Sequence, residues 1–210
     1  MFSTNIIFYK IKNKDELAKK GENMEKHISK KEKASYGFAA VGSYMVAGIT
    51  QSYLMYFFTD ILIIPSAFVM MLMIVARVWD ALNDPMMGVT VDRTSTKYGK
   101  MRPYVLVGSF LMLVTTIVLF MPLTGAPTMF KMIFAAVSYI IFGMAYTLTD
   151  VPAMGLMSVA TPNSDERASL LSFYVTVGSV GSLLPVGLLT IFQSFIPEKY
   201  VYFAMSIFVG

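Results

Sequence analysis

The sequence contains no cysteine and only one histidine, His27. The lack of cysteine excludes disulfide bonds, thiolate catalysis and cysteine-ligated metal sites. His27 lies in a polar N-terminal stretch, so we do not expect a catalytic centre built on histidine. The sequence also lacks a nucleophile paired with a base, a metal-ligand cluster and a phosphate-binding glycine loop, so an enzyme is the least favoured class.

Apolar residues make up 56% of the 210 positions, and the mean hydropathy is +0.62. These values exclude an ordinary soluble domain and indicate an all-α, polytopic membrane protein. We expect helices at about residues 35–58, 67–91, 103–121, 129–157 and 168–195, and a short apolar segment at 200–210. A span needs about 20 residues, so the last segment predicts a sixth helix that is cut off, in a fragment or a truncated gene product.

The basic residues are distributed unevenly along the chain. Residues 1–33 are rich in lysine and predict a cytoplasmic tail whose lysines set the topology or contact anionic lipid, with Met1 or Met24 as the true start and no signal peptide. The loops on the same side carry Arg93, Lys97, Lys100, Arg102 and Arg167, whereas the opposite loops carry only Lys131 and Lys199. The N-terminus is therefore expected in the cytoplasm. A nucleic-acid-binding arm is not expected.

The second predicted helix carries charges within its apolar run. Arg77, Asp80, Asn83 and Asp84 fall within about 120° of one helical face. An ionised Asp or Arg at a helix centre costs roughly 2.5–3.5 kcal/mol on insertion scales, so these side chains must face protein, water or a bound ion. Two carboxylates beside an amide oxygen suit Na⁺ or a proton rather than a soft metal.

A proline follows this acidic face directly. Pro85 has no amide hydrogen, so the carbonyl of Ala81 loses its helical partner and becomes a possible further cation ligand. The alternative interpretation is purely structural, with an ion pair between Arg77 and Asp80 beside a proline kink. That alternative leaves Asp84 unexplained.

A second buried acid repeats this arrangement in the fourth predicted helix. Tyr146, Thr147 and Asp150 share one helical face, and Pro152 frees the carbonyl of Leu148 beside the acid. An acid within the membrane is a functional candidate by default, here as a ligand for substrate or ion. The alternative is an acid held by hydrogen bonds to a neighbouring helix.

The loop after the second predicted helix is rich in charge and glycine. Its candidate residues are Gly88, Asp92, Arg93, Gly99, Lys100 and Arg102. One interpretation is a solvated charged face. The other is a cytoplasmic gate, in which ion pairs latch the helix ends in one state of an alternating-access cycle.

Several motifs, in the same order, resemble the glycoside–pentoside–hexuronide:cation symporters, the melibiose-permease-like branch of the major facilitator superfamily. They are SYGFAAVG, DALNDPMMGVTVDRTSTKYGKMRPY, TDVPAMG and DERASL. The resemblance covers about residues 34–195. It implies a twelve-helix fold of two halves, each an inverted three-plus-three repeat, in a bacterial cytoplasmic membrane. This chain would be the N-terminal half, and the C-terminal six-helix half would be its partner.

The resemblance also implies roles for single residues. Family members couple sugar uptake to Na⁺, H⁺ or Li⁺, with no other cofactor. The set matching the cation-site pattern is Asp80, Asn83, Asp84 and Thr147. Tyr146 and Asp150 match positions near the sugar, and Arg77 matches an arginine of the pore.

The sequence departs from the family pattern on the sugar side. Tyr44 replaces an acid of the melibiose-type members, Tyr174 stands at or beside a sugar-binding arginine, and Met154 replaces an aromatic residue. Tyr44 and Tyr174 are therefore candidate substrate residues together with Tyr146. The departures leave open a different glycoside or a solute that is not a sugar.

The expected function is symport of a sugar or glycoside with Na⁺ or H⁺, of which this chain is one half. Six helices form only one wall of a central cavity, so we expect the isolated chain to be inactive. The alternatives are a membrane solute sensor or assembly partner that transports nothing, and a relative that exports lipid or drug-like solutes.

Overall fold

The computed structural model describes residues 28–210, in which every element is helical. The elements are α2 (Lys30–Tyr56), the π-helical turn η1 (Phe57–Ile61), α3 (Ser66–Arg93), α4 (Arg102–Leu119), α5 (Thr128–Ser158), α6 (Ser164–Gln193) and α7 (Glu198–Val209). The all-α, six-helix architecture predicted from hydropathy is confirmed. His27, Met24 and most of the predicted tail lie outside the described residues.

Local chemistry explains where the helices begin. Ser29 and Glu32 form a capping box at the start of α2, which therefore begins five residues before the predicted position. Asn163 accepts hydrogen bonds from the amides of Asp165 and Glu166, so α6 begins at Ser164 rather than near residue 168. A proline immediately precedes α3, α5 and α7, where its missing amide hydrogen costs no helical bond.

Four helices, α3 to α6, are long and apolar enough to cross a membrane. The prolines inside three of them, Pro85, Pro152 and Pro185, do not end the helices, which continue on both sides. With 27 residues α2 has a comparable length, but it begins with Lys-Lys-Glu-Lys and is more polar. With 12 residues α7 is shorter than a span requires.

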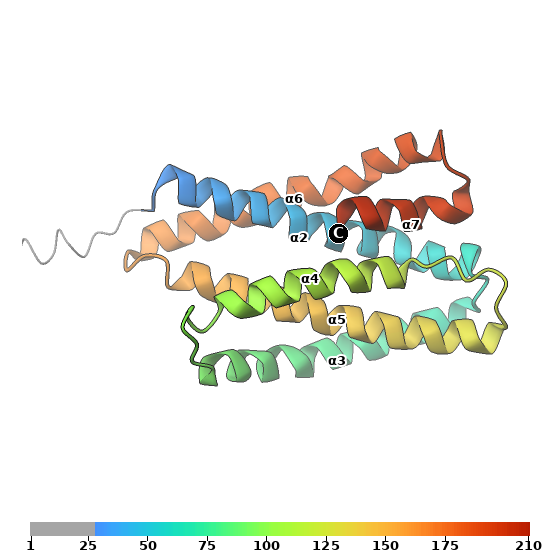
Figure 1. Cartoon of the computed structure of the whole chain (residues 1–210), viewed down its shortest axis with the longest axis horizontal. Helices are drawn as coiled ribbons and strands as arrows, with labels where there is room; N and C mark the ends of the chain where they lie inside the picture. Colours follow the sequence, from blue (N-terminus) through green and yellow to red (C-terminus); the bar gives the residue numbers. More distant parts are fainter. Residues whose placement is uncertain (1–27) are drawn as a thin grey trace, which may run out of the picture.

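The helices form two groups of three (Figure 1). One group contains α2, α6 and α7, and the other contains α3, α4 and α5. Counted along the chain, the first helix packs on the fifth and the second packs on the fourth. In a three-plus-three repeat, the first three helices correspond to the last three, so the pair formed by the first and fifth helices corresponds to the pair formed by the fourth and second. The observed packing therefore agrees with that architecture.

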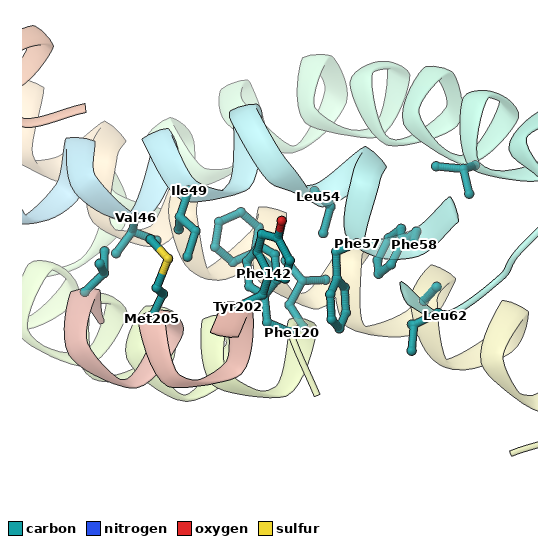
Figure 2. Packing of buried hydrophobic residues seen from close by; sticks show 14 of the residues in the cluster. Val46, Ile49, Leu54, Phe57, Phe58, Leu62, Phe120, Phe142, Tyr202 and Met205 are labelled. Atoms are coloured by element: carbon teal, nitrogen blue, oxygen red, sulfur yellow. The ribbon is translucent and has the colours of Figure 1, made fainter. Parts of the chain in front are cut away.

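A hydrophobic core joins the two groups near one end of the bundle (Figure 2). Phe57 is fully buried, and its ring lies 5.2 Å from that of Phe120 on α4 and 5.9 Å from that of Tyr202 on α7. A smaller cluster near the opposite end consists of Ala40, Met157, Leu170 and Tyr174. The polar face of α3 lies between these two clusters.

Candidate functional site

A cavity of about 190 Å³ lies where α2, α3 and α5 meet. Among the residues that line it are Thr50, Gln51, Arg77, Trp79, Asp80, Asp84, Tyr139, Gly143, Tyr146, Thr147 and Asp150. Six of the predicted site residues thus share one cavity, although they come from helices separated by more than 60 positions. The cavity wall carries three carboxylates and one guanidinium, so it favours cations.

The two acids of α3 have different surroundings. Asp84 Oδ1 accepts a 2.9 Å hydrogen bond from Thr147 Oγ1, which ties α3 to α5 inside the cavity. Asp80 Oδ2 lies 4.0 Å from Arg77 Nη1, and the Arg77 side chain is 72% exposed. An ion pair this long and this exposed contributes at most about 1 kcal/mol. A structural ion pair therefore does not account for the acidic face.

Asn83 is the one predicted cation ligand that does not line the cavity. It lies on the buried side of α3, is 7% exposed, and its amide nitrogen has no hydrogen-bond partner among residues 28–210. The sequence put Asn83 on the same broad face as the two acids. However, α3 packs on α5, and in the packed structure Asn83 is buried whereas the two acids line the cavity.

Asp150 occupies the other part of the cavity wall, on α5. No residue in the described range donates a hydrogen bond to its carboxylate, so it is not held by a neighbouring helix. It lies close enough to interact electrostatically with the hydroxyls of Tyr44, Tyr146 and Tyr174 and with Asp84. A free carboxylate among phenols can accept hydrogen bonds from hydroxyl groups of a ligand.

Tyr44 and Tyr174 lie beyond the cavity lining, between α2 and α6. Their ring centroids are 5.9 Å apart and the ring planes make an angle of 80°, an edge-to-face contact. Tyr174 is 2% exposed and belongs to the smaller core cluster, against which Met154 also packs. Of the three predicted tyrosines, only Tyr146 contributes to the cavity wall.

Several further residues line the cavity that were not predicted from the sequence. A Cβ placed on Gly143 would lie 3.1 Å from Asp80 Oδ1, so the carboxylate sits directly against the backbone of α5. Thr50 and Gln51 bring polar groups from α2. Thr50 and Gln51 could have been identified from the sequence, because they are polar residues within an apolar helix. Gly143 shares a helical face with Thr147 and Asp150, four and seven positions further on, which could have identified it.

The charged loop between α3 and α4 is held by its own backbone and hydroxyl groups. Lys100 Nζ donates to the carbonyl of Asp92 in the last turn of α3, at 3.1 Å. Thr94 and Tyr104 share a 2.6 Å hydrogen bond that joins the two helix ends. Within residues 28–210 the predicted gate residues form no ion pair, and Asp92 and Arg93 are exposed.

No group of three or more His, Cys, Asp or Glu side chains in the described chain is placed to hold a metal ion. A monovalent cation has different requirements, since carboxylate, amide and hydroxyl oxygens together suffice for it. Asp80, Asp84 and Thr147 supply three such groups around one side of the cavity.

Comparison with known proteins shows the family of the chain. A family model described as MFS/sugar transport protein matches residues 35–209, and the chain belongs to this family. Within it, the relatives identify the glycoside–pentoside–hexuronide:cation symporter branch. The chain is 37% identical to the uncharacterized symporter YjmB of Bacillus subtilis over 172 residues, which are 80% of this chain and 37% of the relative.

Two further relatives carry more informative names. The inner membrane symporter YicJ of Escherichia coli is 34% identical over 161 residues, or 75% of this chain and 34% of the relative. The isoprimeverose transporter of Lactiplantibacillus pentosus is 30% identical over 153 residues, or 73% of this chain and 32% of the relative. The matches thus cover about a third of the length of these curated relatives.

Proposed function

We propose that this chain is the N-terminal half of a symporter that carries a neutral sugar or glycoside together with Na⁺ or H⁺ across the cell membrane, with its N-terminus in the cytoplasm. The observation that carries the proposal is the hydrogen bond between Thr147 and Asp84 inside a cavity that also contains Asp80 and Asp150. It brings together, on two helices, the oxygen groups that a small cation needs. The names of the relatives support the same function.

The cation site uses the oxygens of Asp80, Asn83, Asp84 and Thr147. A bound cation neutralises part of the charge on the two acids and strengthens the contact between α3 and α5. Asn83 joins the set when its side chain rotates toward the acids. This rotation breaks no hydrogen bond of the amide nitrogen, which has no partner among residues 28–210. The carbonyl of Ala81, which Pro85 deprives of its helical partner, is a further oxygen near this site.

The substrate site lies around Asp150. Its carboxylate accepts hydrogen bonds from sugar hydroxyls, while Tyr44, Tyr146 and Tyr174 provide aromatic rings and hydroxyl groups, and Arg77 lines the approach. Because Asp84 interacts electrostatically with Asp150, charge neutralisation at the cation site reduces the repulsion between the acids. Cation and sugar then raise each other's affinity by the same factor.

The loop between α3 and α4 acts in the conformational cycle. Gly99 has a φ of +93°, which fixes a turn closed by a hydrogen bond between the Gly99 amide and the Thr96 carbonyl. This turn holds Lys100 on the carbonyl of Asp92 and leaves the side chains of Asp92 and Arg93 exposed. These side chains and that of Arg102 are available for ion pairs with the C-terminal half, and Gly88 lets another helix approach the backbone closely.

Uptake into proteoliposomes by the intact transporter tests the proposal. Asp80→Asn and Asp84→Asn should each abolish uptake driven by a Na⁺ or pH gradient. Retention of full cation dependence by both variants would refute the cation site. Sugar binding without net flux would instead identify a sensor.

A second measurement uses the 210-residue chain alone. Trp79 is its single tryptophan and lines the cavity one position before Asp80, so its fluorescence reports directly on cation binding. We expect a saturable change with the coupling cation that Asp84→Asn removes. An equal response in that variant would place the cation elsewhere.

A further inference from the structure

Resting on the proposed function, the packing of α2 against α6 assigns a role to Gly178, which none of the sequence motifs singled out. We propose that Gly178 is a positioning residue for the substrate site: its bare backbone is the surface on which the ring of Tyr44 lies, and it thereby sets the affinity of the transporter for its sugar.

The contact between Gly178 and Tyr44 is very close. A Cβ placed on Gly178 would lie 2.7 Å from both Cγ and Cδ2 of Tyr44 and 2.9 Å from Cε2. These atoms include the root of the ring, so a small movement of the hydroxyl end does not relieve the overlap. Any side chain at position 178 must therefore displace the whole ring.

Moving the two helices apart to make room would cost their close packing. They lie side by side over most of their length (Figure 1). On one side of Tyr44, a Cβ on Gly181 would lie 3.0 Å from Val41 Cα, and on the other side a Cβ on Gly48 would overlap the carbonyl of Ser182. Separation would break close backbone contacts on both sides of Tyr44, so we expect the ring to move instead.

The position of the Tyr44 ring matters because of its neighbours. It makes an edge-to-face contact with the buried ring of Tyr174 and lies within electrostatic range of Asp150. A ring displaced from α6 loses the contact with Tyr174 and changes its position relative to Asp150. The cation ligands on α3 lie on another helix, so their geometry is not directly affected.

The test is Gly178→Ala in the intact transporter, with Gly187→Ala as the matched control. Gly187 lies on the same helix, and a Cβ there meets nothing within 4 Å. We expect Gly178→Ala to raise the KM for sugar about 10- to 100-fold, the range expected when a positioning group is shifted by about 1 Å. The cation concentration for half-maximal uptake should stay within about twofold at saturating sugar, and the control should change neither value.

Three outcomes give a decision. A double variant, Tyr44→Ala with Gly178→Ala, should have the same KM for sugar as Tyr44→Ala alone. If Gly178→Ala folds poorly by itself, the double variant should restore the amount of folded protein in the membrane. If Gly178→Ala behaves like the control, or raises the sugar and cation constants by the same factor, the positioning role is wrong. No sugar uptake by the unmodified transporter would refute the proposed function itself, and with it this role.

Discussion

The two ends of the cavity are built in different ways. The proposed cation end consists of acids on α3 that contact α5, through the hydrogen bond from Thr147 to Asp84 and the close approach of Asp80 to Gly143. The proposed substrate end has one acid, Asp150, with no hydrogen bond from the described chain and within electrostatic range of tyrosines on three helices. One end is held by polar contacts and the other by aromatic packing.

This difference indicates which properties can change independently. A cation needs oxygens at fixed distances, so each ligand must be held, and the residues at that end match the family pattern. A sugar presents many hydroxyls and a broad apolar face, so aromatic rings can be rearranged around one carboxylate while binding is kept. We therefore expect mutations at the two ends to separate cation coupling from sugar selectivity.

The largest expected effect comes from removing the charge at the substrate end. Asp150→Asn should reduce sugar uptake by about 100-fold, because it weakens two hydrogen bonds from hydroxyls to a carboxylate, each contributing about 1.5–3 kcal/mol. Cation binding, followed by the fluorescence of Trp79 in the isolated chain, should persist. Loss of the cation signal as well would show that the two ends are one site.

A smaller effect concerns the charge of the sugar. The cavity wall carries Asp80, Asp84 and Asp150 against Arg77 alone, so one bound cation leaves a net negative charge. A neutral glycoside should be transported at least about tenfold better than the corresponding glucuronide, a difference of roughly 1.4 kcal/mol in favour of the neutral substrate. Competition between the two in one uptake assay measures this directly. Equal transport would show that the C-terminal half provides compensating positive charge.

A further effect, about three- to tenfold, is expected at the cation end. Gly143→Ala places a Cβ 3.1 Å from Asp80 Oδ1, so the carboxylate must move by a few tenths of an ångström. The cation concentration for half-maximal uptake should rise by this factor, whereas the KM for sugar at saturating cation should stay unchanged. The control is Gly187→Ala. A change in the sugar KM alone would reverse our assignment of the two ends.

The sequence best predicted those structural features that depend on a single helix. Hydropathy predicted the helices, and the spacing of acids and prolines predicted the two polar faces on α3 and α5. It was less informative where two helices meet. Asn83 has the same spacing as the acids, and only the packing of α5 shows that it is buried. The spacing of Gly143 from Thr147 and Asp150 could have placed it on the polar face, but the contacts of Gly143 with Asp80 and of Gly178 with Tyr44 are visible only in the packed structure.

Lys131 is another residue whose environment depends on a second element. The sequence places it among the basic residues of an outer loop, but it is 6% exposed, and its Nζ donates a 2.9 Å hydrogen bond to the carbonyl of Leu62. That carbonyl follows the π-helical turn η1, and the next residue, Ile63, has a φ of +58°. A β-branched residue rarely adopts this conformation, so the turn needs an external partner.

The smallest expected effect on transport follows from this anchor. Lys131→Met keeps the length of the side chain but leaves the carbonyl of Leu62 without its partner, which should cost about 1–3 kcal/mol of stability. Thermal unfolding in detergent should occur at a lower temperature, while the KM for sugar and the cation dependence stay unchanged, since Lys131 is absent from the cavity wall. Lys199→Met, at an exposed lysine, is the control. Altered coupling in Lys131→Met would show that the outer turn participates in the transport cycle, and that the two ends of the cavity are not isolated from it.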